Sequence, residues 1–226
     1  MDYSPAEGRG DSGLARGGTR RGKEFRLGRI GYLNVLPIYH GLECGAVPHG
    51  FELVSGPPAA LNALMAKGRL LASSTSSLEY ARRPERYFLL PNLAIAGNGP
   101  IQSVLLLSRV PLDRLEGRTI LASPASHTSV ALLRLLLRDF FPLAVYWRTG
   151  AAAGALASSQ PPDAFLAIGD EALRLRRHPD YPYRLDLGEA WLRWTGLPFV
   201  FGLWVADRSR CAALPREVHP GEILEQ

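Results

Sequence analysis

Apolar and polar positions alternate along the chain in short blocks, and their spacing predicts a succession of strands and helices. Short apolar runs bounded by Gly, Pro or polar residues indicate strands, whereas apolar residues three or four positions apart indicate helices. The predicted strands are 26–30, 51–56, 69–74, 103–110, 118–123, 143–148, 163–170 and 197–207. The predicted helices are 37–43, 57–68, 75–84 and 124–140. Repeated strand–loop–helix units of this kind predict an α/β protein with mostly parallel sheets.

The pattern restarts in the middle of the chain, which predicts two lobes. The uncharged stretch 87–108 is long enough to span a bilayer, but Pro91, Asn92 and the Gly99-Pro100 pair interrupt it, so it is expected to form two short strands joined by a turn. A second passage between the lobes is expected after the Thr195-Gly196 turn. The predicted boundaries are a flexible tail over 1–24, a first lobe over 25–101 completed by 197–226, and a second lobe over 102–196.

Composition and charge narrow the class of protein. The 226 residues are 46% hydrophobic and 21% charged, which is ordinary for a globular chain. The net charge of +5 raises the possibility of nucleic-acid binding, but nearly all basic residues are arginines scattered among acidic ones, with only Lys23 and Lys67 as lysines. We therefore expect no nucleic-acid partner and no membrane association. The N-terminus lacks an apolar export segment. With Cys44 and Cys211 as the two cysteines, a reducing cytoplasmic location is expected.

The sequence contains none of the common cofactor or nucleophile motifs. It has no P-loop, no dinucleotide-binding glycine pattern, no HExxH and no G-x-S-x-G. The five histidines do not occur at metal-ligand spacing. We therefore expect neither a metal nor a cofactor.

The candidate functional groups are short polar side chains at the ends of strands and the starts of helices. Asn34 follows a strand and precedes a helix, where it either caps the helix or binds a ligand carboxylate. Ser103 opens a strand after a Gly-Pro turn. Ser126, Thr128 and Ser129 surround a helix start, where hydroxyl and N–H groups either cap the helix or hold an anion. If these groups meet in one cleft, they suit a small molecule that carries carboxylates.

Four further positions have a structural and a functional interpretation. Ser76 and Ser77 begin a helix ahead of Glu79, which is expected to cap or pack beneath the site. Asp170 follows a strand, where it most simply caps the next helix and alternatively contacts a ligand. The aromatic residues of 191–204 are expected to lie mostly in the core.

Six segments together resemble the chorismate dehydratases of menaquinone biosynthesis by the futalosine pathway. They are RIGYLNVLPIYHGLE, SSLEYARRPERYFLLPNLAI, GPIQSVLLLSRVPLDRLEGRTI, SHTSVALLRLLL, DAFLAIGDEAL and WLRWTGLPFVFGLW, in the family's order over residues 25–207. The resemblance implies a periplasmic-binding-protein-like fold of type 2, with two α/β lobes, a cleft between them and two crossings. It implies a cofactor-free hydro-lyase whose small-molecule substrate is chorismate.

The resemblance also implies roles for individual residues. Asn34 and Ser103 match the positions that hold the ring carboxylate of chorismate, and we expect them to be catalytic. Ser76, Ser77, Ser126, Thr128, Ser129 and Asp170 are the expected substrate-binding residues. The motifs offer no evident general base, so the hypothesis is that the enolpyruvyl carboxylate of the substrate removes the C3 proton.

Several alternatives stay open at this stage. Family chains continue beyond the LPFVFGLW segment with further helices, whereas this one continues with a short polar stretch, so an inactive, C-terminally truncated dehydratase is one alternative. A non-catalytic carboxylate-binding protein of the same fold is a second. The pathway's dihydroxynaphthoate-forming enzyme is a third, and a DNA-binding regulator is the most distant. The sequence gives no oligomeric state.

Overall fold

The computed structural model describes residues 25–124 and 126–213, whose strands form two five-stranded sheets. The strands are β1 (Phe25–Arg29), β2 (Phe51–Ser55), β3 (Ala72–Ser76), β4 (Tyr87–Gly97), β5 (Val104–Ser108), β6 (Thr119–Ala122), β7 (Tyr146–Thr149), β8 (Ala164–Ile168), β9 (Tyr183–Asp186) and β10 (Phe199–Asp207). The helices are α1 (Leu36–Glu43), α2 (Pro58–Ala66), α3 (Ser77–Arg82), α4 (His127–Leu135), α5 (Ala152–Leu156), α6 (Asp170–Leu175), α7 (Leu187–Thr195) and α8 (Arg208–Ala212). Short 3-10 turns lie at η2 (Leu33–Val35), η3 (Pro84–Arg86) and η4 (Leu112–Arg114), and α4 continues into a π-helical turn, η5 (Leu136–Phe140).

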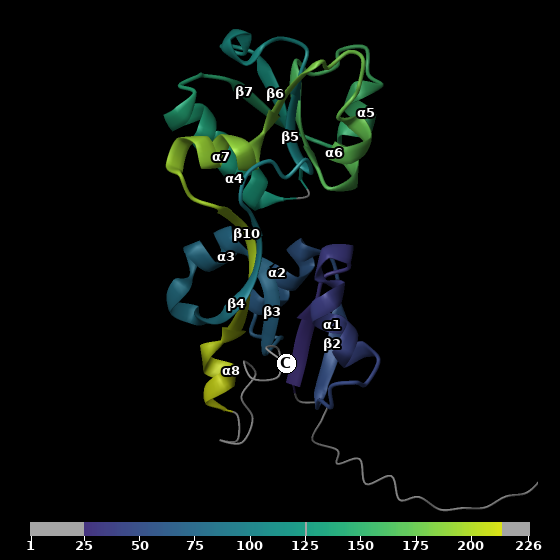
Figure 1. The fold of residues 1–226 in the computed structure, drawn as a ribbon, viewed down its shortest axis with the longest axis vertical. Coiled ribbons are helices and arrows are strands. Elements are labelled where there is room, and N and C mark those ends of the chain that lie inside the picture. Colours follow the sequence, from purple (N-terminus) through teal and green to yellow (C-terminus); the bar gives the residue numbers. More distant parts are fainter. Residues whose placement is uncertain (1–24, 125, 214–226) are drawn as a thin grey trace, which may run out of the picture.

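Each sheet belongs to one lobe, and the lobes are stacked end to end (Figure 1). The strand order is β2-β1-β3-β10-β4 in the first lobe and β7-β6-β8-β5-β9 in the second. In each sheet four strands run in one direction, and the fifth, β10 or β5, runs antiparallel to both of its neighbours. These two are the strands that enter from the other lobe, so they start at the edge where the other strands end. The prediction of two α/β lobes is confirmed, but the sheets are mixed and not mostly parallel, because β10 and β5 each form two antiparallel pairs.

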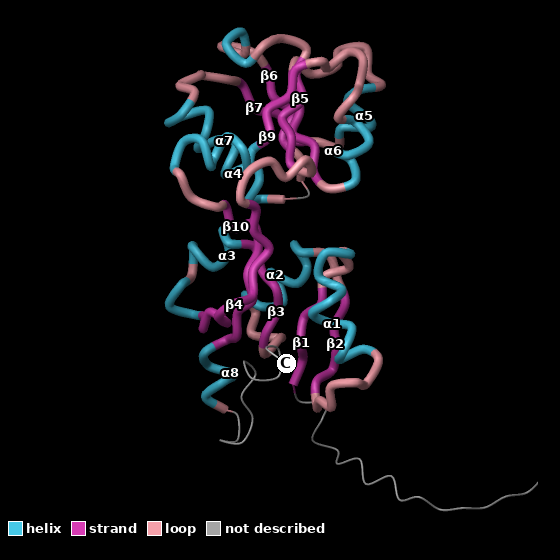
Figure 2. The backbone as a smooth tube through the Cα atoms, viewed as in Figure 1, coloured by secondary structure: helices cyan, strands magenta, loops and turns pink. Residues whose placement is uncertain are grey.

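The chain passes between the lobes twice, from β4 to β5 and from α7 to β10 (Figure 2). Gly196 ends α7 with a φ of 72°, a left-handed conformation that glycine adopts without a steric penalty. The turn expected at Thr195-Gly196 is therefore confirmed. Of the boundaries proposed from the sequence, residues 1–24 and 214–226 lie outside the described residues.

Some element boundaries differ from the predictions. The apolar run at 69–74 was expected to be a strand, but β3 starts three residues later, at Ala72. Leu70 and Leu71 are fully buried ahead of it, and the Leu71 backbone already bonds to Arg26 of β1 and to Asp207 of β10, so the pairing begins one residue before β3. In 87–108 the first strand, β4, is long rather than short, because it follows β10 through two register shifts.

Separate cores stabilise the two lobes. In the first lobe the Tyr39 hydroxyl donates to the Gly28 carbonyl at 2.8 Å and accepts from the Trp204 indole at 3.0 Å, with both rings fully buried. Burial raises the pKa of the Tyr39 phenol. This contact fixes α1, and with it the turn that carries Asn34, on the sheet. In the second lobe Trp191 and Phe199 pack edge to face at 5.2 Å against the core, as expected of the aromatic segment. None of the described helices has the length and apolar character needed to cross a bilayer.

Candidate functional site

The predicted site residues lie at two sheet edges that face each other. In the first lobe, β10 begins beside Ser76, the last residue of β3, so both crossings leave from the edge that carries the helix starts. In the second lobe, Val104 at the start of β5 pairs with Ile168 at the end of β8. The crossings therefore join the edge that carries Asn34, Ser76 and Ser77 to the edge that carries the other candidates. Helices α3 and α4 contact each other across this boundary.

Asn34 presents a free amide. It is exposed in the η2 turn, and its side chain makes no hydrogen bond with any described residue. Val35 occupies the N-cap position of α1 without a side-chain cap bond, so the interpretation of Asn34 as a helix cap is wrong. Its neighbours Tyr32 and Leu33 are also exposed, the latter by 86%. The amide is thus available to a ligand between the lobes.

Ser103 lies half-buried on a loop that a carboxylate holds in place. One oxygen of Asp186 accepts from the Ile101 N–H at 3.0 Å and the Gln102 N–H at 2.7 Å. Its other oxygen caps α7 by accepting from the N–H groups of Gly188 and Glu189. The Ser103 hydroxyl itself has no hydrogen bond within the described chain, so it too is free to contact a ligand.

Ser76 has a structural role that uses its hydroxyl oxygen. The oxygen accepts from the Glu79 N–H at 3.2 Å and so caps α3, as the sequence suggested. The Asn62 amide brackets the residue, donating to the Ser76 hydroxyl at 3.3 Å and accepting from its N–H at 3.4 Å. The neighbouring Ser77 is half-buried and its hydroxyl has no such partner among described residues. Either serine hydroxyl could donate a hydrogen bond to a ligand.

At the start of α4 the three hydroxyl side chains differ. Ser126 caps the helix by accepting from the Ser129 N–H at 3.2 Å, and the two serine hydroxyls lie 3.1 Å apart. Thr128 is 4% exposed, and its hydroxyl has no hydrogen-bond partner in the described structure. A buried hydroxyl without a partner is costly to the folded protein, and a ligand would relieve that cost.

Asp170 does not cap its helix. Gly169 occupies the N-cap position of α6 with a φ of 62° and no side-chain cap bond, and Asp170 follows as an exposed first helical residue. The expectation that Asp170 most simply caps α6 is therefore wrong, because the left-handed turn at glycine moves the aspartate into the helix. Among the described residues no three His, Cys, Asp or Glu side chains are grouped so that they could bind a metal ion.

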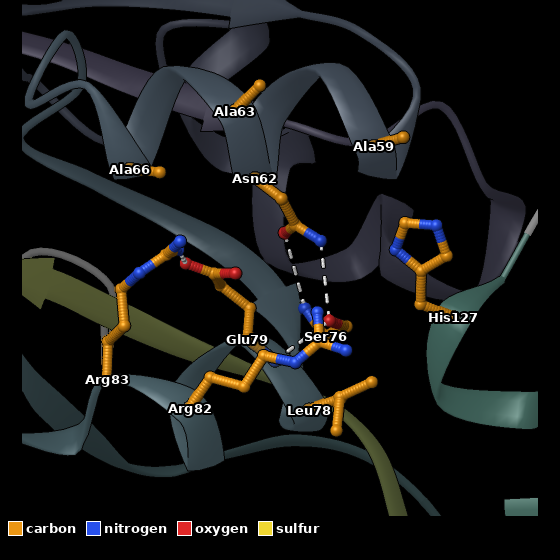
Figure 3. Close-up of a pocket in the computed structure, with 10 residues that line it drawn as sticks. All are labelled: Ala59, Asn62, Ala63, Ala66, Ser76, Leu78, Glu79, Arg82, Arg83 and His127. Atoms are coloured by element: carbon orange, nitrogen blue, oxygen red, sulfur yellow. Dashed lines mark hydrogen bonds and ion pairs between the residues drawn. The ribbon is translucent and has the colours of Figure 1, made fainter. Parts of the chain in front are cut away.

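A cavity of about 230 Å³ opens beside Ser76, between α2 and α3 (Figure 3). Its lining residues are Ala59, Asn62, Ala63, Ala66, Ser76, Leu78, Glu79, Arg82, Arg83 and His127. His127 reaches it from α4 of the second lobe, whereas all the others belong to the first lobe.

Glu79 forms part of the wall of this cavity together with Arg83. Its carboxylate, 9% exposed, is paired with the Arg83 guanidinium and accepts from the Tyr87 hydroxyl at 3.1 Å. Burial and this carboxylate together raise the pKa of Tyr87 to about 12. These contacts confirm the structural role expected for Glu79.

Sequence reasoning missed Asn62, Asp186 and Arg82. Asn62 bonds to Ser76, 14 positions away in the sequence. Asp186 bonds to the Ser103 loop, about 85 positions away. Arg82 lies in a recognised segment, but nothing local indicates that it faces a cavity. No periodic signal marks such residues, since their partners are defined by packing.

Several known proteins are similar to this chain over most of its length. The pattern of a protein family described as menaquinone biosynthesis matches residues 25–220. A chorismate dehydratase of Thermus thermophilus is 32% identical over 202 residues, 83% of this chain and 71% of that protein. A chorismate dehydratase of Campylobacter jejuni is 31% identical, over 77% of this chain and 64% of that protein. A 1,4-dihydroxy-6-naphtoate synthase of Thermus thermophilus is 31% identical, over 82% and 66%. The chain thus spans about two thirds of the length of these relatives.

Solved structures show the same fold at low identity. A protein from Archaeoglobus fulgidus superimposes with a TM-score of 0.63 at 19% identity, over 88% of this chain and 70% of that one. The alkanesulfonate-binding protein SsuA of Xanthomonas axonopodis pv. citri, bound to MOPS, gives 0.51 at 14% identity, over 89% and 69%. The fold is therefore the periplasmic-binding-protein-like fold. With its pattern matched over most of its length, the chain belongs to the menaquinone-biosynthesis family.

Proposed function

We propose that the protein is a chorismate dehydratase, which eliminates water from chorismate to give 3-[(1-carboxyvinyl)oxy]benzoate. Its similarity to two chorismate dehydratases supports the reaction. The structural observation that carries the proposal is the pair of free side chains, the Asn34 amide and the Ser103 hydroxyl, on facing edges of the two lobes. A carboxylate held between them would contact both lobes.

In the proposed reaction the C3 proton and the C4 hydroxyl leave as water, and the ring becomes aromatic. As the C3–H bond breaks, negative charge spreads through the ring diene to the C1 carboxylate. Hydrogen bonds from Asn34 and Ser103 to that carboxylate therefore become stronger in the transition state, which accelerates the reaction. The enolpyruvyl carboxylate of the substrate removes the C3 proton and passes it to the leaving C4 hydroxide, which departs as water, so the protein acts by positioning and electrostatics.

The remaining candidates would bind and orient the substrate. Thr128 is the strongest of these candidates, because its buried hydroxyl has no hydrogen-bond partner in the described structure. Ser77 and the exposed Asp170 are available to polar groups of the substrate. The Ser126 hydroxyl already caps α4 and the Ser129 hydroxyl lies 3.1 Å from it, so both residues would contribute through the shape and N–H groups of the helix start.

The test is incubation of the purified protein with chorismate, followed by chromatography for the enolpyruvyl benzoate. Removing one hydrogen-bond donor to the developing charge costs on the order of 3 kcal/mol, so Asn34→Ala and Ser103→Ala should each lower kcat about a hundredfold or more. Ser159→Ala is the matched control, because Ser159 is exposed and has no hydrogen bond within the described chain. A chorismate analogue without the enolpyruvyl carboxylate should bind and not react; its normal turnover would disprove the role of that group.

The same experiment separates the alternatives. A folded protein that binds chorismate without forming product would support a carboxylate-binding role without the dehydratase reaction. Failure to bind chorismate, together with turnover of a cyclic futalosine-type substrate, would favour the naphtoate synthase reaction of the third relative.

A further inference from the structure

The cavity between α2 and α3 has an uncompensated positive charge. Glu79 and Arg83 neutralise each other in an ion pair, and Tyr87 also donates to Glu79. Arg82 lines the same cavity and has no hydrogen bond or ion pair with any described residue. Figure 3 shows its side chain extended across the cavity toward the side where His127 lies. An unpaired guanidinium facing a cavity favours an anion, and a carboxylate above all, because it can form two parallel hydrogen bonds.

Neutral polar groups in the cavity add to this preference. The Asn62 amide nitrogen and the Ser76 hydroxyl lie on its lining, and the His127 ring closes it from the second lobe. The rest of the lining is small and apolar, mainly alanines of α2. At about 230 Å³ the cavity is smaller than the roughly 300–1,000 Å³ clefts that hold drug-sized ligands. It nevertheless has ample room for one small anionic group of a ligand.

The cavity adjoins the edges between which the substrate is proposed to bind. Ser76 ends β3 at the facing edge of the first lobe, and His127 opens α4 at the facing edge of the second. A ligand bound between the lobes could therefore extend one of its groups into the cavity. The other end of that ligand would lie toward Asn34 and Ser103.

We propose that this cavity is a second carboxylate pocket, in which Arg82 binds the second anionic group of a dicarboxylate ligand. Arg82 thereby makes the protein select dicarboxylates over monocarboxylates, and His127 makes the pocket complete only when the lobes lie together. The proposal rests on the proposed function for the dicarboxylate nature of the ligand, but the pocket can be tested without turnover.

The test compares two stable ligands that differ by one carboxylate, 3-(carboxymethoxy)benzoate and 3-methoxybenzoate, by isothermal titration calorimetry on the full chain. The wild-type protein should bind the dicarboxylate about tenfold or more tightly, as expected for one charge-assisted bidentate contact. Arg82→Ala should bind the two ligands with equal affinity, and Arg82→Lys should recover part of the preference. Arg174→Ala is the control, because Arg174 is likewise an exposed arginine in the last turn of a short helix.

Each outcome decides the proposal. Equal affinities in the wild-type protein, an unchanged preference in Arg82→Ala, or no binding of either ligand would overturn it. Loss of the preference in Arg174→Ala as well would also overturn it, because the effect would then reflect overall charge. Failure of the dehydratase reaction is a separate result: a protein that prefers the dicarboxylate through Arg82 but forms no product from chorismate has the pocket without the reaction.

Discussion

Replacing Asp186 with asparagine should weaken both the fold and the activity, because this carboxylate joins two distant segments. Its two oxygens accept four N–H groups, two from the Ser103 loop and two from the start of α7. In Asp186→Asn only one oxygen remains, and the amide nitrogen cannot accept, so two donors lose their acceptor. At about 1 kcal/mol for each partly solvated donor, the free energy of unfolding should fall by about 2 kcal/mol. For a chain of this size that lowers Tm by about 4–8 °C.

The activity of the same variant reports on the position of Ser103. Gln102, beside Ser103, has a φ of 59°, which is unfavourable for a residue with a side chain and is sustained by its N–H bond to Asp186. When that bond is lost the loop should relax, and kcat/KM for chorismate should fall tenfold to a hundredfold.

Urea denaturation and steady-state kinetics on the same preparation measure the two effects. Asp113→Asn is the control, since Asp113 is exposed and bonded to no described residue. If Asp186→Asn matches the control in both measurements, the carboxylate does not hold the loop and the reasoning is refuted.

Four further predictions concern buried polar groups. Tyr39→Phe should cost about 2–4 kcal/mol in urea denaturation, because the Trp204 indole and a β1 carbonyl lose their buried partner; a loss below 0.5 kcal/mol would contradict this. Since the pKa of Tyr87 is raised to about 12 from 10.0, the free energy of unfolding should fall as pH rises through that interval, and Tyr87→Phe should lack this part of the pH dependence. Burial acts to raise the pKa of Asp207, but hydrogen bonds from its neighbours outweigh it and hold the pKa below 3.8, so its stabilisation is present above that value and is lost on acidification. Asp207→Asn should destabilise the protein at neutral pH by about 3 kcal/mol and flatten its acid unfolding curve; an unchanged curve would count against this. Thr128→Val should raise the free energy of unfolding by about 1 kcal/mol, because it removes a buried hydroxyl that has no partner among the described residues, yet weaken chorismate binding about tenfold in calorimetry; unaltered binding would remove Thr128 from the site.

Where the two partners of a hydrogen bond lie within a few residues of each other, the sequence was enough to predict the local structure. The serines that open α3 and α4 were recognised as caps because their acceptor oxygens lie three residues from the N–H groups they bind. The glycine after α7 marked a helix end because a left-handed φ is easiest for glycine. Alternating apolar blocks and the six recognised segments gave the two lobes and the family.

Contacts between distant segments were decided by the tertiary structure alone. The Asp186 clamp on the Ser103 loop, the Asn62 bracket around Ser76 and the cavity that Arg82 shares with His127 each join elements that packing brings together. Asp170 was misjudged because the φ of Gly169 shifted it by one position, which composition does not reveal. The sequence by itself determined which elements form, because hydrophobic spacing and capping act over one or two turns. Which free side chains can face one ligand was decided by the end-to-end placement of the two lobes. That placement depends on the two crossings and on the packing of both cores.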